Sequence, residues 1–384
     1  MASLKHMDQG TNEKGRKVTI SVFKADVGGP GHMKPFPEMI REVQEFLLRN
    51  GRELFRSVHV SATGDDITII MGHQRGPNDV QIHKLAWEAF LAGTEVAKNL
   101  NAYAAGQDLF NSAFCGNLAG MGPQIIEMEM EERTGETFVL LCLDKTRAGA
   151  LNGPLRRAFA DVNFNTGLLH SGAMQAGYIF EVQDNYFEGP GERVIRLNSA
   201  HEMAELTALL VNDDRYVIKS IFSAATGELG AMVSTFCLDR HSETHVGKDD
   251  PVALMRVQGV WPALGDVLNP FSLIFLVAGG MRGSHRVPLM PVKIETCVSD
   301  SDGPAVVSAQ VFCTKGGMLT NPADAFDQPT WDEARRKAAQ MAAWLRSIEP
   351  DGTTLPPNEI EYHGIHDTVK KLQSRFTVIN KPVE

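Results

Sequence analysis

The chain has 384 residues, of which 43% are apolar and 22% are charged, values typical of a globular protein with a sizeable core. Its formal net charge of −10 argues against a nucleic-acid partner, which normally requires a basic surface. No apolar run approaches the ~18 residues that a membrane-spanning helix needs, so we expect no membrane partner.

The number and spacing of the cysteines indicate the cellular compartment of the protein. The five cysteines are dispersed and odd in number: Cys115, Cys142, Cys237, Cys297 and Cys313. This pattern disfavours a disulfide framework and a structural zinc site, and it predicts a cytoplasmic protein.

The two ends of the chain are expected to lie outside the folded domain. Residues 1–16 lack the apolar region of a signal peptide, and we interpret them as a disordered extension, natural or introduced by cloning. Because no low-complexity linker or internal repeat interrupts the rest, we expect residues 17–376 to form a single domain, followed by a tail over 377–384.

The first quarter of the chain predicts strands and helices in alternation. Residues 17–29 alternate β-branched and polar side chains and then break at two glycines, which predicts a strand that runs into a loop. Residues 37–50 and 79–100 have apolar side chains at helical spacing. Between these helices, residues 55–73 predict two strands joined by a tight turn at positions 64–66.

The remainder of the chain predicts more strands than helices. Residues 137–146 are almost wholly apolar, which is typical of a strand at the centre of a sheet. Other strands are expected over 125–133, 215–238 (a hairpin), 251–259, 273–279 and 305–317, and helices over 201–210 and 331–348. Because hairpins are common and no regular βαβ alternation appears, we expect an α/β (α+β) fold with antiparallel or mixed sheets.

Acidic residues gather next to glycines at the ends of the expected strands. They are Asp26, Asp65, Asp66, Asp144, Asp249, Asp250 and Asp302. Any one of them alone is best explained as a turn residue that caps the backbone. Adjacent like charges between apolar strands, however, repel unless a cation lies between them. The set therefore points to Mg²⁺, with His32 as either a further ligand or a solvated loop residue.

Two segments have the composition of phosphate-binding loops. Arg282 and Arg286 stand among glycines after an apolar strand, where the backbone can approach an anion and arginine can bind it in a bidentate manner. An ordinary cationic loop explains them equally well. A second glycine-rich turn, over 114–123, is a weak signal by itself. The sequence contains neither a P-loop nor a Rossmann fingerprint.

Longer motifs make the sequence similar to a known family. The segments "FKADVGG", "TGDDITIIM", "AYAAGQDL", "GNLAGMGP", "LDKTRAGALNGPL", "VGKDDPV", "GGMRGSH" and "NPADAFDQPTWDEARR" resemble, in order, those of the archaeal-type (class V) fructose-1,6-bisphosphate aldolase/phosphatase family. The resemblance runs from about Lys17 to Phe376. It implies a four-layer α-β-β-α sandwich, a cytoplasmic homo-octamer and a role in gluconeogenesis.

The resemblance also implies a two-step activity. The enzyme would condense dihydroxyacetone phosphate with glyceraldehyde 3-phosphate through a lysine imine. It would then hydrolyse the 1-phosphate of fructose 1,6-bisphosphate with Mg²⁺, several ions per site, to give fructose 6-phosphate.

Site residues follow from the resemblance position by position. The implied metal ligands are Asp26, His32, Asp65, Asp66, Gln107, Asp144, Asp249 and Asp250. The implied substrate contacts are Tyr103, Gly116, Asn117, Lys145, Gln258, Arg282, Asp302 and Tyr362. Lys248 corresponds to the lysine that forms the imine.

Three positions differ from the family pattern. His245 stands where the family has the tyrosine that donates and accepts the proton of the aldol step, the loop from Asp26 to His32 is one residue shorter, and Leu151 replaces a tryptophan. Histidine and tyrosine can both transfer protons. The alternatives are therefore an intact bifunctional enzyme, a relative with phosphatase activity only or with another aldehyde acceptor, and a non-catalytic protein that binds sugar phosphates.

Overall fold

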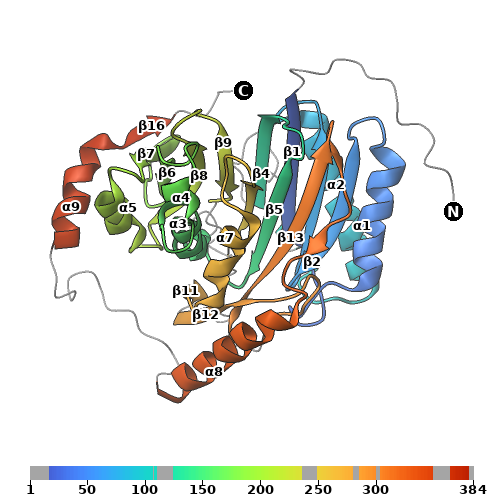
Figure 1. Ribbon diagram of the computed structural model, residues 1–384. Helices are drawn as coiled ribbons and strands as arrows, with labels where there is room; N and C mark the ends of the chain where they lie inside the picture. The colour runs from blue at the N-terminus through green and yellow to red at the C-terminus, as the bar shows by residue number, and fades with distance from the viewer. Residues whose placement is uncertain are drawn as a thin grey trace.

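The computed structural model describes residues 17–106, 108–109, 124–235, 249–279, 285–299, 303–348 and 364–379. These residues form two β-sheets and several helices (Figure 1). The mixed α/β class expected from the sequence is confirmed. No helix in these ranges is long and apolar enough to cross a lipid bilayer.

The smaller sheet has four antiparallel strands in the order β2-β3-β1-β4. Their bounds are β1 Lys17–Asp26, β2 Ser57–Thr63, β3 Asp66–His73 and β4 Gln124–Glu131. Two helices cover its outer face, α1 (Pro37–Asn50) and α2 (Val80–Asn99) (Figure 1). Helix α2 begins after Asp79, whose carboxylate accepts hydrogen bonds from the N–H groups of Gln81 and Ile82.

The larger sheet has the order β11-β12-β13-β5-β10-β9-β8-β6-β7-β16, and β14 and β15 also pair with β13. Within the described ranges its pairs are antiparallel except β12 with β13. The strands are β5 Thr137–Asp144, β6 Tyr178–Asp184, β7 Glu192–Asn198, β8 Tyr216–Ser223, β9 Leu229–Val233, β10 Val252–Val257, β11 Leu276–Gly279, β12 His285–Pro291, β13 Ala305–Lys315, β14 Met318–Leu319, β15 Ala323–Asp324 and β16 Thr377–Ile379.

Helices line the other face and the ends of the larger sheet. They are α3 Asn152–Ala160, α4 Gly167–His170, α5 Met203–Leu210, α7 Leu264–Leu268, α8 Asp332–Ile348 and α9 Gly364–Leu372, with short 3₁₀ turns at η1 Ala148–Leu151, η2 Asn269–Ser272, η3 Pro329–Trp331 and η5 Gln373–Arg375. Helix α8 lies along β12 at the edge of the molecule (Figure 1).

Alternating side chains on β5 define the layers, because successive residues of a strand point to opposite faces. Phe138, Leu140 and Cys142 belong to an apolar cluster shared with β1 and β4 of the smaller sheet. Leu141 and Leu143 belong to a cluster shared with α3, α5 and α7. A third cluster joins the other face of β1 to α1 and α2. The layers are therefore helix, sheet, sheet and helix, as the family resemblance implies.

The structure agrees with most of the expected elements and differs at some boundaries. The apolar segment over 137–146 contains β5, which lies between β13 and β10 as a central strand should. The strand expected over 273–279 begins only at Leu276, because its partner β12 turns to pair with β13 from Leu289 onward. Strand β16 continues to Ile379, past the boundary expected at 376.

Candidate active site

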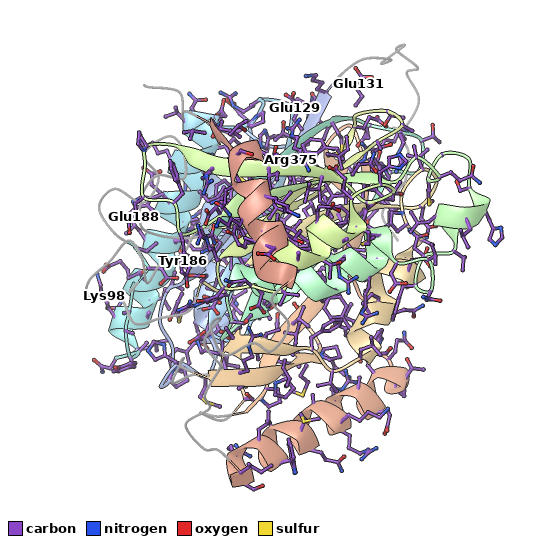
Figure 2. All side chains as sticks on the ribbon, turned by 90° about the vertical axis from the view of Figure 1, so that its left-hand side faces the viewer. Lys98, Glu129, Glu131, Tyr186, Glu188 and Arg375 are labelled. Carbon is purple, nitrogen blue, oxygen red and sulfur yellow. The ribbon has the colours of Figure 1, made fainter. Side chains whose placement is uncertain are left out.

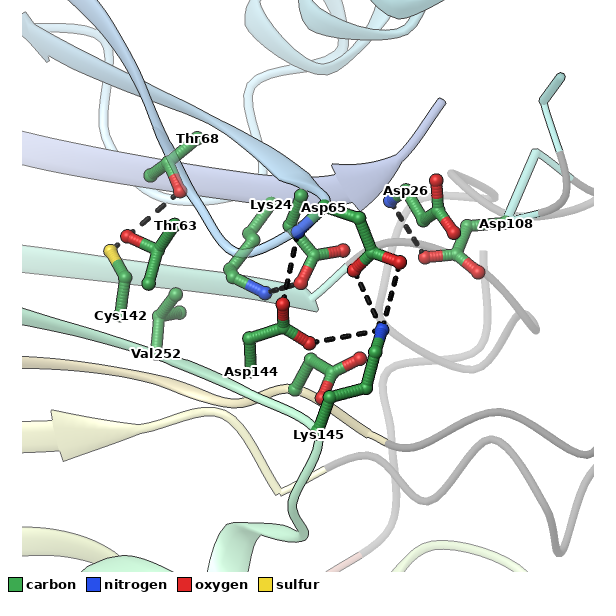
Figure 3. Close-up of polar contacts among 12 residues, drawn as sticks. Lys24, Asp26, Thr63, Asp65, Thr68, Asp108, Cys142, Asp144, Lys145 and Val252 are labelled. Carbon is green, nitrogen blue, oxygen red and sulfur yellow. Dashed lines mark hydrogen bonds and ion pairs between the residues drawn. The ribbon is translucent and has the colours of Figure 1, made fainter. Parts of the chain in front are cut away.

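Three strand ends from the two sheets meet at one edge of the sandwich. Strand β1 ends at Asp26, which pairs with Asp66 at the start of β3. The β2–β3 turn carries Asp65, whose backbone N–H donates a 2.9 Å hydrogen bond to Oδ2 of Asp144. Since Asp144 ends β5 of the other sheet, the expected strand-end aspartates do lie together in space (Figure 3).

Gly64 makes this close approach possible. Its φ of +59° is in the left-handed region that favours glycine. A Cβ at this position would lie 1.3 Å from Oδ2 of Asp144. The glycine in the expected tight turn therefore brings the two sheets into contact at the carboxylates.

The first group of potential ligands is Asp26, His32 and Asp65, whose ligand atoms all lie within 4.8 Å of one another. Nδ1 of His32 is 3.2 Å from a carboxylate oxygen of each aspartate. These two hydrogen bonds raise the pKa of His32 to about 9, although burial opposes the charge. His32 thus points into the cluster rather than into solvent. This orientation favours His32 as a metal ligand over His32 as a solvated loop residue.

The second group is Asp65, Asp66 and Asp144, again within 4.8 Å, and all three are buried. Burial and the neighbouring carboxylates raise the pKa values of Asp66 and Asp144 well above their usual range. For Asp65 burial acts in the same direction, but Lys145 and His32 outweigh it and hold the pKa below its usual range. Asp65 belongs to both groups and links them.

Lys145 supplies positive charge at the outer side of the cluster. Its Nζ lies 2.7 and 2.8 Å from the two oxygens of Asp65 and 3.1 Å from Oδ1 of Asp144. Burial opposes its charge, yet the two aspartates raise the pKa of Lys145 well above its usual range. In this arrangement Lys145 is the counter-ion of the acids, and its contact with substrate stays a prediction.

Asp249 and Asp250 reach the same edge from the loop before β10, the neighbour of β5. Asp250 and Thr146 exchange two hydrogen bonds, backbone N–H to carbonyl at 3.0 Å and backbone N–H to Oδ1 at 3.2 Å. Asp249 is buried. The negative charge of Asp250 is among the causes that raise the pKa values of Asp66 and Asp144.

This set of residues fits a divalent cation. The donors are mostly buried carboxylate oxygens, the ligands that Mg²⁺ prefers. Oδ1 of Asp144 is buried and accepts no hydrogen bond from the described residues, although Nζ of Lys145 lies 3.1 Å away. Several buried acids close to one another call for more positive charge than His32, Lys145 and the buried Lys24, which pairs with Asp66, provide.

Tyr103 lies at the mouth of the site. Its backbone pairs with Gly29 through two hydrogen bonds of 2.9 and 3.2 Å. Its ring meets that of His32 edge to face, with 4.9 Å between centroids, while the residue is 63% exposed. The residue is therefore accessible beside His32, and its contact with substrate stays a prediction.

The predicted substrate contact Gln258 lies away from the carboxylate cluster. Gln258 follows the far end of β10, since Val252 of that strand pairs with Cys142 near the cluster and Val257 with Thr137 away from it. A single chain does not bring Gln258 to the aspartates, and its role stays a prediction.

Arg286, weighed above as a phosphate-binding residue, is held elsewhere. It forms a bidentate pair with Asp213 at 2.5 and 2.9 Å and also donates to the carbonyl of Leu276 at 3.0 Å. For Arg286 the structure supports the reading of an ordinary cationic loop.

Several predicted residues lie outside the described ranges and remain predictions. They are the catalytic candidates His245 and Lys248, the metal ligand Gln107, and the substrate contacts Gly116, Asn117, Arg282, Asp302 and Tyr362.

Sequence reasoning missed two residues at the site. Asp108 accepts a 2.9 Å hydrogen bond from the backbone N–H of Asp26, and burial followed by the charge of Asp26 raises the pKa of Asp108 to about 8. Lys24 is buried and pairs with Asp66. Along β1, Lys24 alternates with Val22 and Asp26 and therefore shares a strand face with them, but this local pattern does not show that the face is buried.

Comparison with known proteins defines the class. A family model described as fructose-1,6-bisphosphatase matches residues 17–377, almost the whole chain. The protein therefore belongs to this fructose-1,6-bisphosphatase family.

Individual relatives carry a more specific name. The chain is 42% identical over 375 residues to a protein of Ignicoccus hospitalis (96% of this chain, 94% of the relative) and 42% identical over 370 residues to one of Moorella thermoacetica (95% and 96%). A Thermus thermophilus protein is 40% identical over 363 residues (94% and 100%). All three are named fructose-1,6-bisphosphate aldolase/phosphatase, so the resemblance found in the motifs is confirmed.

Proposed function

We propose that this chain is a Mg²⁺-dependent fructose-1,6-bisphosphate aldolase/phosphatase that forms fructose 6-phosphate from triose phosphates. One observation carries the proposal: two potential ligand groups share the buried Asp65 at the edge where the sheets meet, and Asp249 at that edge directly follows Lys248 in the chain. The aldol reaction requires an amine nucleophile, and the hydrolysis of the phosphate requires a metal cluster.

The residues Asp26, His32, Asp65, Asp66, Asp144, Asp249 and Asp250 would hold the cations, with Gln107 as a further ligand. When bound, Mg²⁺ supplies positive charge to phosphate oxygens and lowers the pKa of an attacking water. Lys145 then has a second role. Once cations balance Asp65 and Asp144, its ammonium is no longer needed as their counter-ion and donates to a substrate phosphate.

In the aldol half, the amine of Lys248 adds to the ketone carbon of dihydroxyacetone phosphate, and loss of water gives an imine. A base removes a proton from the adjacent hydroxymethyl carbon, and the electron pair left behind forms a bond to the aldehyde carbon of glyceraldehyde 3-phosphate. The aldehyde oxygen takes up a proton, and water hydrolyses the imine. His245 is the residue we assign to these proton transfers.

In the phosphatase half, the phosphate that came from dihydroxyacetone phosphate faces the carboxylate cluster. Tyr103 contacts the sugar phosphate, and the carboxylates would hold the 1-phosphate through the cations that they bind. Water attacks the phosphorus, and the bond to the sugar oxygen breaks, which releases phosphate and fructose 6-phosphate. The predicted contacts Gly116, Asn117, Gln258, Arg282, Asp302 and Tyr362 complete substrate binding in this proposal. A cytoplasmic homo-octamer acting in gluconeogenesis is proposed from the family resemblance.

The decisive experiment incubates the protein with both triose phosphates, with and without Mg²⁺, and measures fructose 6-phosphate and free phosphate. We expect both products only with Mg²⁺. A His245→Tyr variant is assayed in parallel and should retain the aldol step. Borohydride trapping with dihydroxyacetone phosphate and peptide mapping should label Lys248, and a Lys248→Ala variant that still trapped substrate would refute its role.

A phosphatase without aldolase activity is the second candidate, and His245 at the family's tyrosine position favours it. It predicts phosphate release from fructose 1,6-bisphosphate but no hexose phosphate from trioses. Mg²⁺-dependent binding of sugar phosphates with no turnover of either kind would instead indicate a non-catalytic binding protein.

A further inference from the structure

Lys24 is a lysine enclosed in the protein interior. It is 1% exposed and lies on β1 two residues before Asp26, on the strand face that carries Ile20 and Val22 into the core between the sheets. Lysine is rarely buried to this extent without a partner for its charge. The position therefore requires an explanation from its surroundings.

The partner of Lys24 is Asp66, one of the proposed metal ligands. The ammonium contacts Oδ2 of Asp66, and Asp66 lies in one group of carboxylates with Asp65 and Asp144. Lys24 thus adjoins a group of carboxylates contributed by both sheets. A cation at this point balances negative charge that would otherwise be buried without compensation.

The two lysines of the cluster stand on opposite sides of it. In Figure 3, Thr63, Thr68, Cys142 and Val252 lie on the side of Lys24, toward the core, whereas Lys145 enters from the loop side. The Lys145 side chain is 14% exposed and that of Lys24 1%. A ligand can therefore displace Lys145 from its acids, whereas Lys24 is enclosed.

We propose that Lys24 is a fixed cation of the metal cluster, a positioning residue that balances Asp66 and thereby limits how tightly, and in what number, exchangeable divalent cations bind. The inference rests on the proposed metal site. It follows from Coulomb's law, because a fixed positive charge a few ångströms from a cation site lowers the affinity of that site.

The test is a Lys24→Met variant, whose side chain is likewise unbranched but one atom shorter and carries no charge. Its melting temperature is measured in chelator and across a Mg²⁺ titration, and bound metal is counted after equilibrium dialysis. We expect the Mg²⁺ concentration for half-maximal stabilisation to fall roughly tenfold or more, or one additional ion to bind per chain. The rise in melting temperature from chelator to saturating Mg²⁺ should exceed that of the wild type.

Lys17→Met is the matched control. Lys17 lies at the other end of β1 and pairs with Glu129 at 2.7 Å, with 61% of its side chain exposed. Figure 2 shows Glu129 and Glu131 at this outer end, where β4 runs beside the start of β1. The control should titrate with Mg²⁺ as the wild type does. Lys24→Arg, which retains the charge, should also keep the wild-type Mg²⁺ dependence.

Three results would overturn the inference. A Lys24→Met protein with unchanged Mg²⁺ dependence would make Lys24 an ordinary core ion pair. Weaker or fewer bound ions would mean that Lys24 only orients Asp66. A variant that cannot be recovered even at high Mg²⁺ would show that a divalent ion cannot replace the missing charge. Failure of the proposed function would appear differently, as wild-type protein that binds no Mg²⁺ or turns over no substrate.

Discussion

Gly64 lies in the β2–β3 turn of the smaller sheet and Asp144 at the end of β5 in the larger one, yet a Cβ added to Gly64 would lie only 1.3 Å from Oδ2 of Asp144. This approach allows the N–H of the next residue, Asp65, to donate to the same oxygen. The geometry of the carboxylate cluster therefore depends on the absence of a side chain at position 64.

Gly64→Ala should destabilise the protein strongly. The left-handed backbone costs about 1–2 kcal/mol for alanine, and the collision with Asp144 adds about 1–3 kcal/mol, so we expect the free energy of unfolding in urea to fall by about 3 kcal/mol. Gly135→Ala is the matched control, since its φ is +72° and nothing lies within 4 Å of its Cβ position. An equal loss of unfolding free energy in both variants would show that the collision with Asp144 does not contribute.

Asp65→Asn should abolish most Mg²⁺-dependent phosphate release. Asp65 is shared by both ligand groups, and loss of several kcal/mol of transition-state stabilisation corresponds to about 100-fold or more in kcat. The measurement is steady-state hydrolysis of fructose 1,6-bisphosphate across a Mg²⁺ titration. The surface residue Asp327, whose side chain is 56% exposed, supplies the control Asp327→Asn. Activity of Asp65→Asn within a few fold of wild type would count against the assigned cluster.

A Tyr103→Phe variant distinguishes the contribution of the hydroxyl group from that of the ring. The edge-to-face contact with His32 should survive, so the melting temperature should stay within about 1 °C of wild type. Loss of one hydrogen bond to substrate should raise KM for fructose 1,6-bisphosphate about fivefold with little change in kcat. An unchanged KM would exclude the predicted hydroxyl contact.

Glu136 should contribute to stability in a pH-dependent way. Burial acts to raise its pKa, but hydrogen bonds from Arg133 and Arg256 outweigh it and hold the pKa below its usual value of 4.5. Because the folded-state pKa is depressed, this contribution is fully present above about pH 4.5 and is lost as the pH falls through the folded-state value.

Urea unfolding at a series of pH values from about 5 to 3 measures this effect. The free energy of unfolding should fall less steeply for Glu136→Gln than for wild type, although the variant starts from a lower value since Arg256 loses its partner. Glu53→Gln, at an exposed glutamate of the turn after α1, should keep the wild-type slope. Parallel curves for Glu136→Gln and wild type would contradict the assignment.

Much of the site followed from local sequence patterns. Asp26, Asp65 and Asp144 were recognisable because each stands at the end of an expected strand, and Asp65 also follows a glycine directly. The structure brings all three together. Their contact depends on two different sheets, which no local pattern encodes. The motif resemblance supplied that information, including the four layers.

Other features could not be read from one-dimensional patterns. Lys24 resembles any polar residue of an alternating strand until the second sheet is placed over it, which makes its face an interior one. Arg286 has the glycine-rich surroundings of an anion site, but Asp213, 73 residues earlier in the chain, pairs with it. In both cases the decisive neighbour is distant in sequence.

The hydrogen bond from Asp65 to Asp144 joins the two sheets at the edge where the ligands gather. Any cation bound between these strand ends would link the two sheets. Its affinity would therefore depend on how the sheets pack against each other. Side chains in the core between them, such as Leu140, could then tune metal binding without touching the metal. Metal binding and the relative position of the two sheets would then be coupled, so that a change in either one alters the other.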